Sequence, residues 1–130
     1  MKQINTDNAP QAIGPYSQAI VVNGFVFASG QIAINPETNA VVEGGVEEQA
    51  HQVFRNIRNL LAAAGTSMDK VVKTTVFMAD MNDFATVNGI YGEYFTEPYP
   101  ARSAVAVKAL PKNVLIEVEV IAEAQLSDNE

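Results

Sequence analysis

The chain has 130 residues, a formal net charge of −7 and no cysteine, with a pI of about 4.6. The absence of cysteine excludes disulfide bonds and any chemistry that needs a thiol. The eight Lys and Arg residues are scattered along the chain, so the sequence lacks the basic patch that nucleic-acid binding requires. The sequence is still compatible with binding of a small anionic ligand, because one buried arginine can create a local site in a negative protein.

A chain of this length most simply forms one domain with its own core. No linker, repeat or low-complexity tract divides residues 1–130, so we expect a single domain. The N-terminal stretch has no apolar signal-peptide region, and no apolar run reaches the roughly 20 residues that cross a membrane. We therefore expect a cytoplasmic protein that binds neither membranes nor nucleic acids.

The first half of the chain predicts a hairpin followed by a helix. Residues 20–34, IVVNGFVFASGQIAI, are two apolar segments around an Asn-Gly pair, which is a strong hairpin signal. A polar loop follows. In residues 46–64, apolar side chains recur at helical spacing and form one stripe. Two glutamates in the first turn and Gly65 just past the end are typical of helix boundaries.

The next segment predicts a strand and a second helix. Residues 70–79, KVVKTTVFMA, are rich in β-branched residues and predict a strand. Residues 80–95, DMNDFATVNGIYGEYF, predict a helix with Asn82 as its N-cap. Gly89 and Gly92 weaken this helix by roughly 1 kcal/mol each relative to alanine. Either another group packs closely against them, or the helix is simply a weak one at the surface.

Residues 102–109 and 114–124 predict two final strands, joined at LPKN into a hairpin. The order of elements is therefore ββ-α-β-α-ββ, which is typical of an α+β domain. Helices that cross between strands of one sheet imply a mixed sheet with both helices packed on one face. The opposite face of this sheet then needs another covering.

Arg102, one of three arginines, opens the first strand of that hairpin in the stretch YPARSAV. We expect Val105 and Val107 to face the core. Because strand side chains alternate between faces, Arg102 and Ala104 then lie on the opposite face.

In the final strand the even-numbered residues are mostly valine, and Glu117 and Glu119 face the other way. The predicted pairing puts these two carboxylates beside Arg102. A face of this kind is too apolar for ordinary solvent exposure and too charged for a core. It predicts a subunit interface that holds a small polar pocket. The alternative is an exposed Arg–Glu ion pair, worth less than about 1 kcal/mol.

Five short stretches, in order and at suitable spacing, resemble the RidA family, also called YjgF. They are GPYSQA (14–19), SGQI (29–32), VVKTTVFMADMNDFATVN (71–88), PARSAV (100–105) and IEVEVIA (116–122). The resemblance runs from about residue 4 to residue 124, so it covers nearly the whole chain.

The resemblance implies a chorismate-mutase-like fold and a homotrimer with sites between its subunits. It implies a 2-iminoacid/2-enamine deaminase, which hydrolyses 2-iminobutanoate or 2-iminopropanoate to 2-keto acids and ammonia. Pyridoxal-phosphate-dependent dehydratases release these reactive imines. The implied partners are small carboxylates, namely imine and enamine acids and 2-keto acids, and the reaction needs neither a metal nor an organic cofactor.

Transferred residue by residue, the resemblance makes Arg102 the carboxylate anchor and Glu117 the catalytic group that holds or activates the attacking water. A guanidinium suits the anchor because its planar fork gives two parallel hydrogen bonds. Five further residues would line the substrate pocket, namely Tyr16, Ser29, Gly30, Asn88 and Ala104. Many members of the family have cysteine where this chain has Ala104. The alanine can replace it if that position contributes mainly its backbone N–H.

Two other classes of function stay open. A trimer of the same shape could hold 2-keto acids or other small carboxylates without turning them over, and Arg102 would serve that role equally. The third class is a protein-interaction role, or the RNA cleavage attributed to some relatives. The negative charge argues against RNA.

Apart from the resemblance, several residues allow simpler interpretations. Tyr16 follows Gly-Pro and could be a packed turn tyrosine, and Ser29-Gly30 could be a bulge at a strand end. His51 is expected to be a solvated residue of the first helix, and one histidine without cysteine lacks the usual zinc ligands. Glu119 is expected to be a solvated or interface charge.

Overall fold

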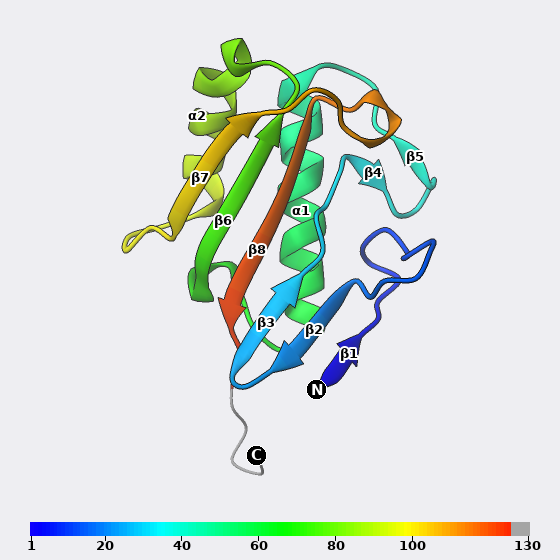
Figure 1. The fold of residues 1–130 in the computed structure, drawn as a ribbon, viewed down its shortest axis with the longest axis vertical. Helices are drawn as coiled ribbons and strands as arrows, with labels where there is room; N and C mark the ends of the chain where they lie inside the picture. The colour runs from blue at the N-terminus through cyan, green and yellow to red at the C-terminus, as the bar shows by residue number, and fades with distance from the viewer. Residues whose placement is uncertain (126–130) are drawn as a thin grey trace.

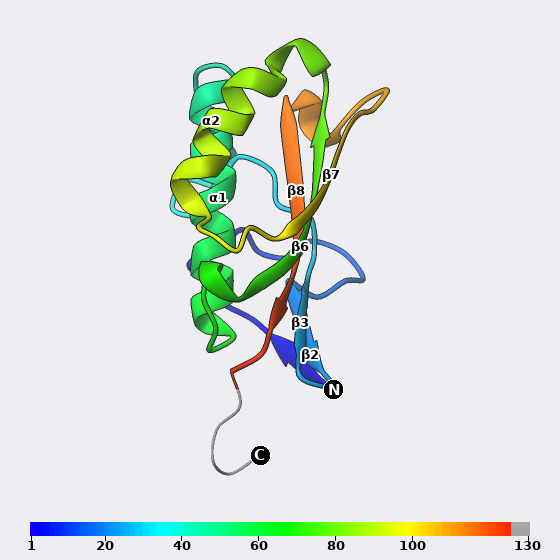
Figure 2. The same cartoon turned by 90° about the vertical axis from the view of Figure 1, so that its left-hand side faces the viewer.

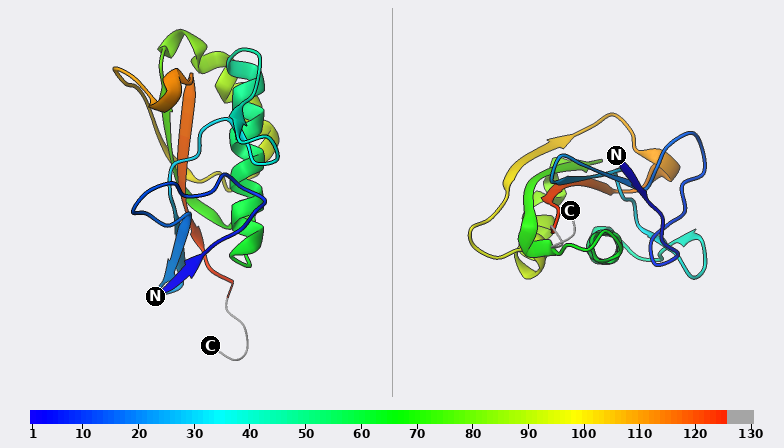
Figure 3. Two further views of the ribbon diagram at one scale, coloured as in Figure 1. Left: turned by 90° about the vertical axis from the view of Figure 1, so that its right-hand side faces the viewer. Right: turned by 90° about the horizontal axis from the view of Figure 1, so that it is seen from below.

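The computed structural model describes residues 1–125. One sheet of six strands runs through it in the order β1-β2-β3-β8-β6-β7, and a small second sheet pairs β4 with β5. Both helices cover the same face of the large sheet, as Figure 1 and Figure 2 show. Figure 3 shows the same two layers from the opposite side and from below. The predicted mixed sheet with two helices on one face is confirmed.

The bounds of the elements are as follows. The strands are β1 (Lys2–Ile4), β2 (Ala19–Val22), β3 (Phe25–Ala28), β4 (Ile34–Asn35), β5 (Ala40–Val41), β6 (Val71–Met78), β7 (Ala101–Ala106) and β8 (Ile116–Glu123). The helices are α1 (Val46–Ala63) and α2 (Phe84–Tyr94), and short 3-10 turns are η1 (Met68–Lys70), η2 (Met81–Asp83) and η3 (Pro111–Asn113).

The first hairpin forms where the sequence predicts it. Asn23 and Gly24 have φ angles of 52° and 80°, the left-handed conformation that a two-residue hairpin turn requires. The second strand ends at Ala28 rather than continuing to residue 34. Beyond it, Gln31 makes one isolated bridge to Val118 of β8, and the chain then leaves the sheet.

Helix α1 also matches its prediction closely. The backbone N–H of Gly45 donates to the Glu48 carboxylate at 3.0 Å, which satisfies a donor that a helix start leaves unpaired. Gly65 follows the end of the helix with a φ of 80°. The apolar stripe is buried against the sheet and comprises Ala50, Val53, Phe54, Ile57, Leu60 and Leu61.

Helix α2 differs from its prediction in two respects. It begins at Phe84, and Asn82 lies in the preceding 3-10 turn, where its backbone N–H donates to the Asp80 carboxylate at 2.8 Å. Asn82 is therefore not the N-cap of α2. A Cβ built on Gly89 or Gly92 would meet no atom within 4 Å. The two glycines thus have no close packing partner among residues 1–125.

The predicted final hairpin is wrong, because β6 lies between β7 and β8 (Figure 1). β7 pairs with β6 in parallel, and β8 pairs with the other edge of β6 in antiparallel. The physical reason is the β6-α2-β7 crossover, which places its two strands side by side in parallel. At the end of β6, Val107 N donates to Met78 O at 2.9 Å and Ala79 N donates to Leu115 O at 3.0 Å.

The observed register puts Arg102 on the face that the helices cover. Thr74 of β6 pairs with Arg102 on one side and with Val120 on the other. Paired residues point to the same face of a sheet, and Thr74 and Val120 are both buried. The prediction that Val105 faces the core is wrong, since Val105 is 43% exposed on the opposite face.

The same register puts Glu117 on the open face. Phe77 of β6 pairs with Glu117 of β8 and with Val105 of β7, so these three side chains share the face away from the helices. The even-numbered residues of β8 are buried as predicted. Arg102 and Glu117 therefore lie on opposite faces of one sheet, and the prediction that they share a face is wrong within one chain.

No helix in residues 1–125 combines the length and the apolar composition that a membrane crossing needs.

Candidate active site

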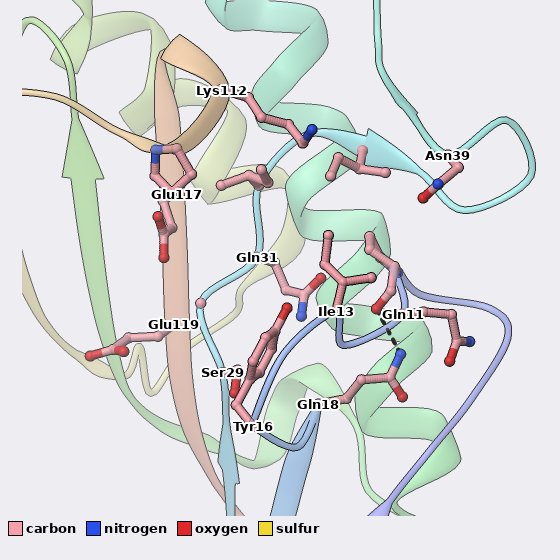
Figure 4. A pocket seen from close by; sticks show the side chains of 15 residues that line it. Gln11, Ile13, Tyr16, Gln18, Ser29, Gln31, Asn39, Lys112, Glu117 and Glu119 are labelled. Carbon is pink, nitrogen blue, oxygen red and sulfur yellow. Dashed lines mark hydrogen bonds between the residues drawn. The ribbon is translucent and has the colours of Figure 1, made fainter.

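The predicted site residues separate into two groups. Tyr16, Ser29, Gly30 and Glu117 line a cavity of about 550 Å³, which we call the Glu117 pocket (Figure 4). Asn88 and Arg102 line a second cavity of about 480 Å³, which we call the Arg102 pocket. Ala104 lines neither cavity and lies half-buried in β7, two residues beyond Arg102.

Helix α2 holds the guanidinium of Arg102. Its Nη1 donates to Oδ1 of Asn88 at 2.7 Å, and its Cζ lies 4.7 Å from the ring centroid of Tyr91 and 5.3 Å from that of Phe84. Positions 84, 88 and 91 fall on one face of a helix. Two aromatic faces and one neutral amide therefore orient the cation without neutralising its charge.

Tyr91 is itself held in place by a residue of the sheet. Its hydroxyl forms a buried hydrogen bond with Oγ1 of Thr74 at 2.8 Å, and Thr74 is the β6 residue that pairs with Arg102. Burial raises the pKa of the Tyr91 phenol above its ordinary value, so the ring beneath the guanidinium stays neutral at physiological pH. The strand and the helix thus position Arg102 together.

The Glu117 pocket depends on the absence of a side chain at Gly30. Gln31 and Val118 exchange backbone hydrogen bonds of 2.8 and 3.1 Å, which brings the Gly30 backbone against Glu117. A Cβ at Gly30 would lie 3.0 Å from Cδ of Glu117 and would clash with its Oε2. Only glycine lets the carboxylate lie against the backbone here.

The environment of Glu117 favours its protonated form. Burial raises the pKa of the Glu117 carboxyl above its ordinary value, and the negative charge of Glu119 raises that pKa further. Glu119 is exposed on the same strand, two residues along. A carboxyl with a raised pKa is suited to exchange protons near neutral pH.

Ser29 and Tyr16 form the lower end of the pocket in Figure 4, below Gln31. Ser29 Oγ donates to the backbone oxygen of Ser17 at 2.6 Å, and Ser29 N donates to the backbone oxygen of Gln18 at 2.9 Å. Ser29 thus ties the end of β3 to the segment that carries Tyr16. Tyr16 is 52% exposed, so it is not the packed turn tyrosine of the simpler interpretation.

Buried amide side chains that were not predicted from the sequence hold segments on both sides of the Glu117 pocket. Gln49 accepts a hydrogen bond from Leu115 N at 2.8 Å, just before β8. Asn56 donates to the backbone oxygens of Ile32 and Ile34 at 3.2 and 2.8 Å. The available signal was their place on α1, on the same side as the apolar stripe.

His51 differs from its expectation as a solvated residue. It is half-buried, and its Nδ1 lies 2.9 Å from the hydroxyl of Tyr94. In the described part of the chain, no group of three or more His, Asp or Glu residues is arranged to hold a metal ion.

A family model described as endoribonuclease L-PSP matches residues 6–124. The chain therefore belongs to the RidA/YjgF family.

Relatives at high identity carry more specific names. Human 2-iminobutanoate/2-iminopropanoate deaminase is 51% identical over 119 residues, which cover 92% of this chain and 87% of that protein. The structure of RidA from a Psychrobacter species superposes with a TM-score of 0.91 at 46% identity, covering 95% of this chain and 99% of that one. E. coli TdcF with bound serine superposes with a TM-score of 0.90 at 42% identity, covering 96% and 100%.

Replacing Glu119 by glutamine removes the like charge beside Glu117. We expect the pKa of Glu117 to fall in Glu119→Gln, yet to stay above its ordinary value because burial is the larger cause. A pH titration of the carboxyl carbons by NMR measures this shift. Glu123→Gln on the same strand is the matched control and should leave the Glu117 titration unchanged. An unchanged or higher Glu117 pKa in Glu119→Gln would contradict the charge effect.

Proposed function

We propose that this protein is a 2-iminobutanoate/2-iminopropanoate deaminase that converts reactive imine acids into 2-keto acids and ammonia. The observation that carries the proposal is the pair of functional groups in the two pockets. Arg102 presents a cation whose neighbours are neutral, and Glu117 is a half-buried carboxyl with a raised pKa. The human relative of that name supports the choice of reaction.

The proposed site forms between two copies of the chain. Arg102 and Glu117 lie on opposite faces of the sheet, so one chain alone cannot bring both to a four-carbon substrate. The open face exposes Phe25, Phe27 and Val105 by 40, 44 and 43%, and such apolar exposure is typical of a surface that another subunit covers. We propose a homotrimer, as the family resemblance implies, in which three identical contacts close a ring and give three equivalent sites.

In this mechanism Arg102 binds the substrate carboxylate through two N–H groups. Within residues 1–125 its guanidinium makes one side-chain hydrogen bond, and a guanidinium has five N–H donors. Arg102 lines the Arg102 pocket together with Tyr99 and Pro100, and there its remaining donors would bind the carboxylate. A bidentate contact orients the imine as well as binding it.

Glu117 of the adjoining copy then transfers protons. It accepts a proton from water while the water oxygen bonds to C2, and the electron pair of the C=N double bond moves to nitrogen, which takes up that proton. In the resulting carbinolamine, the hydroxyl proton passes through Glu117 to the nitrogen. The C–N bond then breaks, ammonia leaves with the bonding pair, and C2 becomes the carbonyl of the 2-keto acid.

A non-catalytic carboxylate binder is the second candidate, since the E. coli TdcF structure contains bound serine. Such a binder needs Arg102 but not a proton-transferring Glu117. RNA cleavage, which the description of the family model suggests, is not supported by a net charge of −7 and scattered Lys and Arg residues.

Arg102→Ala tests the anchor. A pyridoxal-phosphate threonine dehydratase supplies the imine, semicarbazide traps it, and the protein's activity lowers semicarbazone formation in favour of 2-ketobutyrate. We expect Arg102→Ala to lose roughly a hundredfold in kcat/KM, because a charged contact is lost. Arg58→Ala is the matched control. Cζ of Arg58 lies 5.8 Å from the ring centroid of Tyr94, and Arg58 lines neither pocket. Normal deamination by Arg102→Ala with either threonine or serine as precursor would refute the anchor.

Glu117→Gln separates the enzyme from the binder. We expect kcat to fall by about a hundredfold or more, because general acid–base catalysis is lost. The affinity for 2-ketobutyrate, measured by calorimetry, should stay close to that of the wild type because Arg102 is intact. A wild type that binds 2-ketobutyrate but shows no turnover above background would favour the binder. Turnover above background that is equal in Glu117→Gln and wild type would refute proton transfer by Glu117. Glu123→Gln controls for a change of charge on β8.

Mixing two inactive variants tests the shared site. Trimers reassembled from equal amounts of Arg102→Ala and Glu117→Gln chains contain about a quarter of sites with an intact arginine from one chain and an intact glutamate from the other. We expect mixing to restore activity in that proportion, while each variant reassembled alone stays inactive. Absence of any recovery in trimers that mass spectrometry shows to be mixed would place both residues of a site in the same chain.

A further inference from the structure

The segment before β2 carries Tyr16 into the Glu117 pocket without regular structure of its own. Residues 5–18 contain no helix and no strand. A segment of this kind has backbone N–H and C=O groups that lack a ladder partner and must find other ones. Its conformation therefore depends on hydrogen bonds from elsewhere in the chain.

The side chain of Tyr16 does not fix its own position. Within residues 1–125 the only hydrogen bond of Tyr16 is that of its backbone N–H, which donates to Gly14 O at 2.9 Å. The residue is 52% exposed, so packing restrains its side chain little. The direction of the ring is set by the backbone on which it stands.

One buried side chain organises that backbone. Gln18 is 3% exposed, and its Oε1 accepts from Thr6 N at 2.7 Å. Its Nε2 lies 3.0 Å from the backbone oxygen of Thr6, 2.8 Å from that of Pro10 and 3.3 Å from that of Ala9. Gln18 directly precedes β2, and its amide thus holds residues 6–10, the N-terminal part of the segment, against the start of that strand.

The backbone of Gln18 completes the connection. Its carbonyl oxygen accepts from Ser29 N at 2.9 Å, and the preceding carbonyl, that of Ser17, accepts from the Ser29 hydroxyl at 2.6 Å. One end of the Tyr16 segment is therefore attached to the pocket wall, and the other end is attached to Gln18 itself. Tyr16 lies in the loop that these attachments close.

We propose that Gln18 is a positioning residue of the site, which holds Tyr16 in the Glu117 pocket by binding residues 6–10. This inference rests on the proposed function for its kinetic part. Glutamine suits the task because its amide offers a donor and an acceptor at one end of a flexible stem. Methionine has the same length without these groups. Glutamate keeps the acceptor but turns a carboxylate toward three carbonyl oxygens.

The kinetic test is a double-mutant cycle of Gln18→Met and Tyr16→Ala. Each single variant should lower kcat/KM for the imine by tenfold or more, in kcat more than in KM, because Arg102 still binds the substrate. Gln18 also lines the Glu117 pocket, so the cycle separates a direct role from a positioning role. If Gln18 acts through Tyr16, the double variant should be no worse than Tyr16→Ala alone. Gln18→Glu should lose as much as Gln18→Met.

A structural readout keeps the proposal independent of turnover. The chain has four tyrosines, so the ring signals of ¹³C-labelled tyrosine are few, and Tyr16→Phe assigns that of Tyr16. Gln18→Met should shift and broaden the Tyr16 signal while those of the other tyrosines stay in place. Ile57→Val is the matched control, since it weakens the α1 core and should leave the Tyr16 signal unchanged.

Losses that add in the double variant, or an effect of Gln18→Met where Tyr16→Ala has none, would overturn the proposal. So would an unmoved Tyr16 signal in Gln18→Met. A wild-type protein without deaminase activity would refute the proposed function alone, and the tyrosine spectra would then decide the role of Gln18.

Discussion

The position of β6 between β7 and β8 is the constraint on which the rest of this structure depends. The parallel pairing of β7 aligns Arg102 with Thr74, and the antiparallel pairing of β8 aligns Glu117 with Phe77. Because side chains alternate along β6, residues opposite positions 74 and 77 point to different faces. A shift of either strand by one residue would move its functional group to the other face. The register thus decides which face carries each group and, in the proposed function, which surfaces a second copy brings together.

In the loops, side-chain amides form the hydrogen bonds to backbone groups that neighbouring strands form in the sheet. Gln18, Gln49 and Asn56 are all buried, and each binds backbone atoms of a segment that borders the Glu117 pocket. In the described part of the chain, every buried side-chain N or O atom has a hydrogen-bond partner. A buried amide is stable only when it is paired. The segments are therefore held in one arrangement, because moving one would leave polar atoms unpaired.

Local sequence patterns predicted where the helices and strands lie better than they predicted which strands pair in the sheet. The Asn23-Gly24 turn and α1 are specified by residues close in sequence, and both form where expected. The prediction of a final hairpin was wrong because the short loop between β7 and β8 suggested that these two strands pair. The crossover through α2 instead places β7 beside β6. The family resemblance named the site residues, and the structure divides all of them except Ala104 between two pockets. Strand pairing between distant segments decides that division, and no single stretch of sequence encodes it.

The separation of Arg102 from Glu117 also keeps the two groups from pairing with each other within one chain. Had both side chains shared a face, as the alternation of residues first suggested, they could have paired within the chain, and an ion pair offers little to an incoming carboxylate. Instead the partner of Arg102 is the neutral amide of Asn88, with two aromatic rings beneath it. The carboxylate of Glu117 lies against the Gly30 backbone beside a second negative charge. An acidic protein thereby keeps one cation available for an anionic ligand. In the proposed function, the carboxyl that transfers protons stays apart from that cation until two copies of the chain assemble around the substrate.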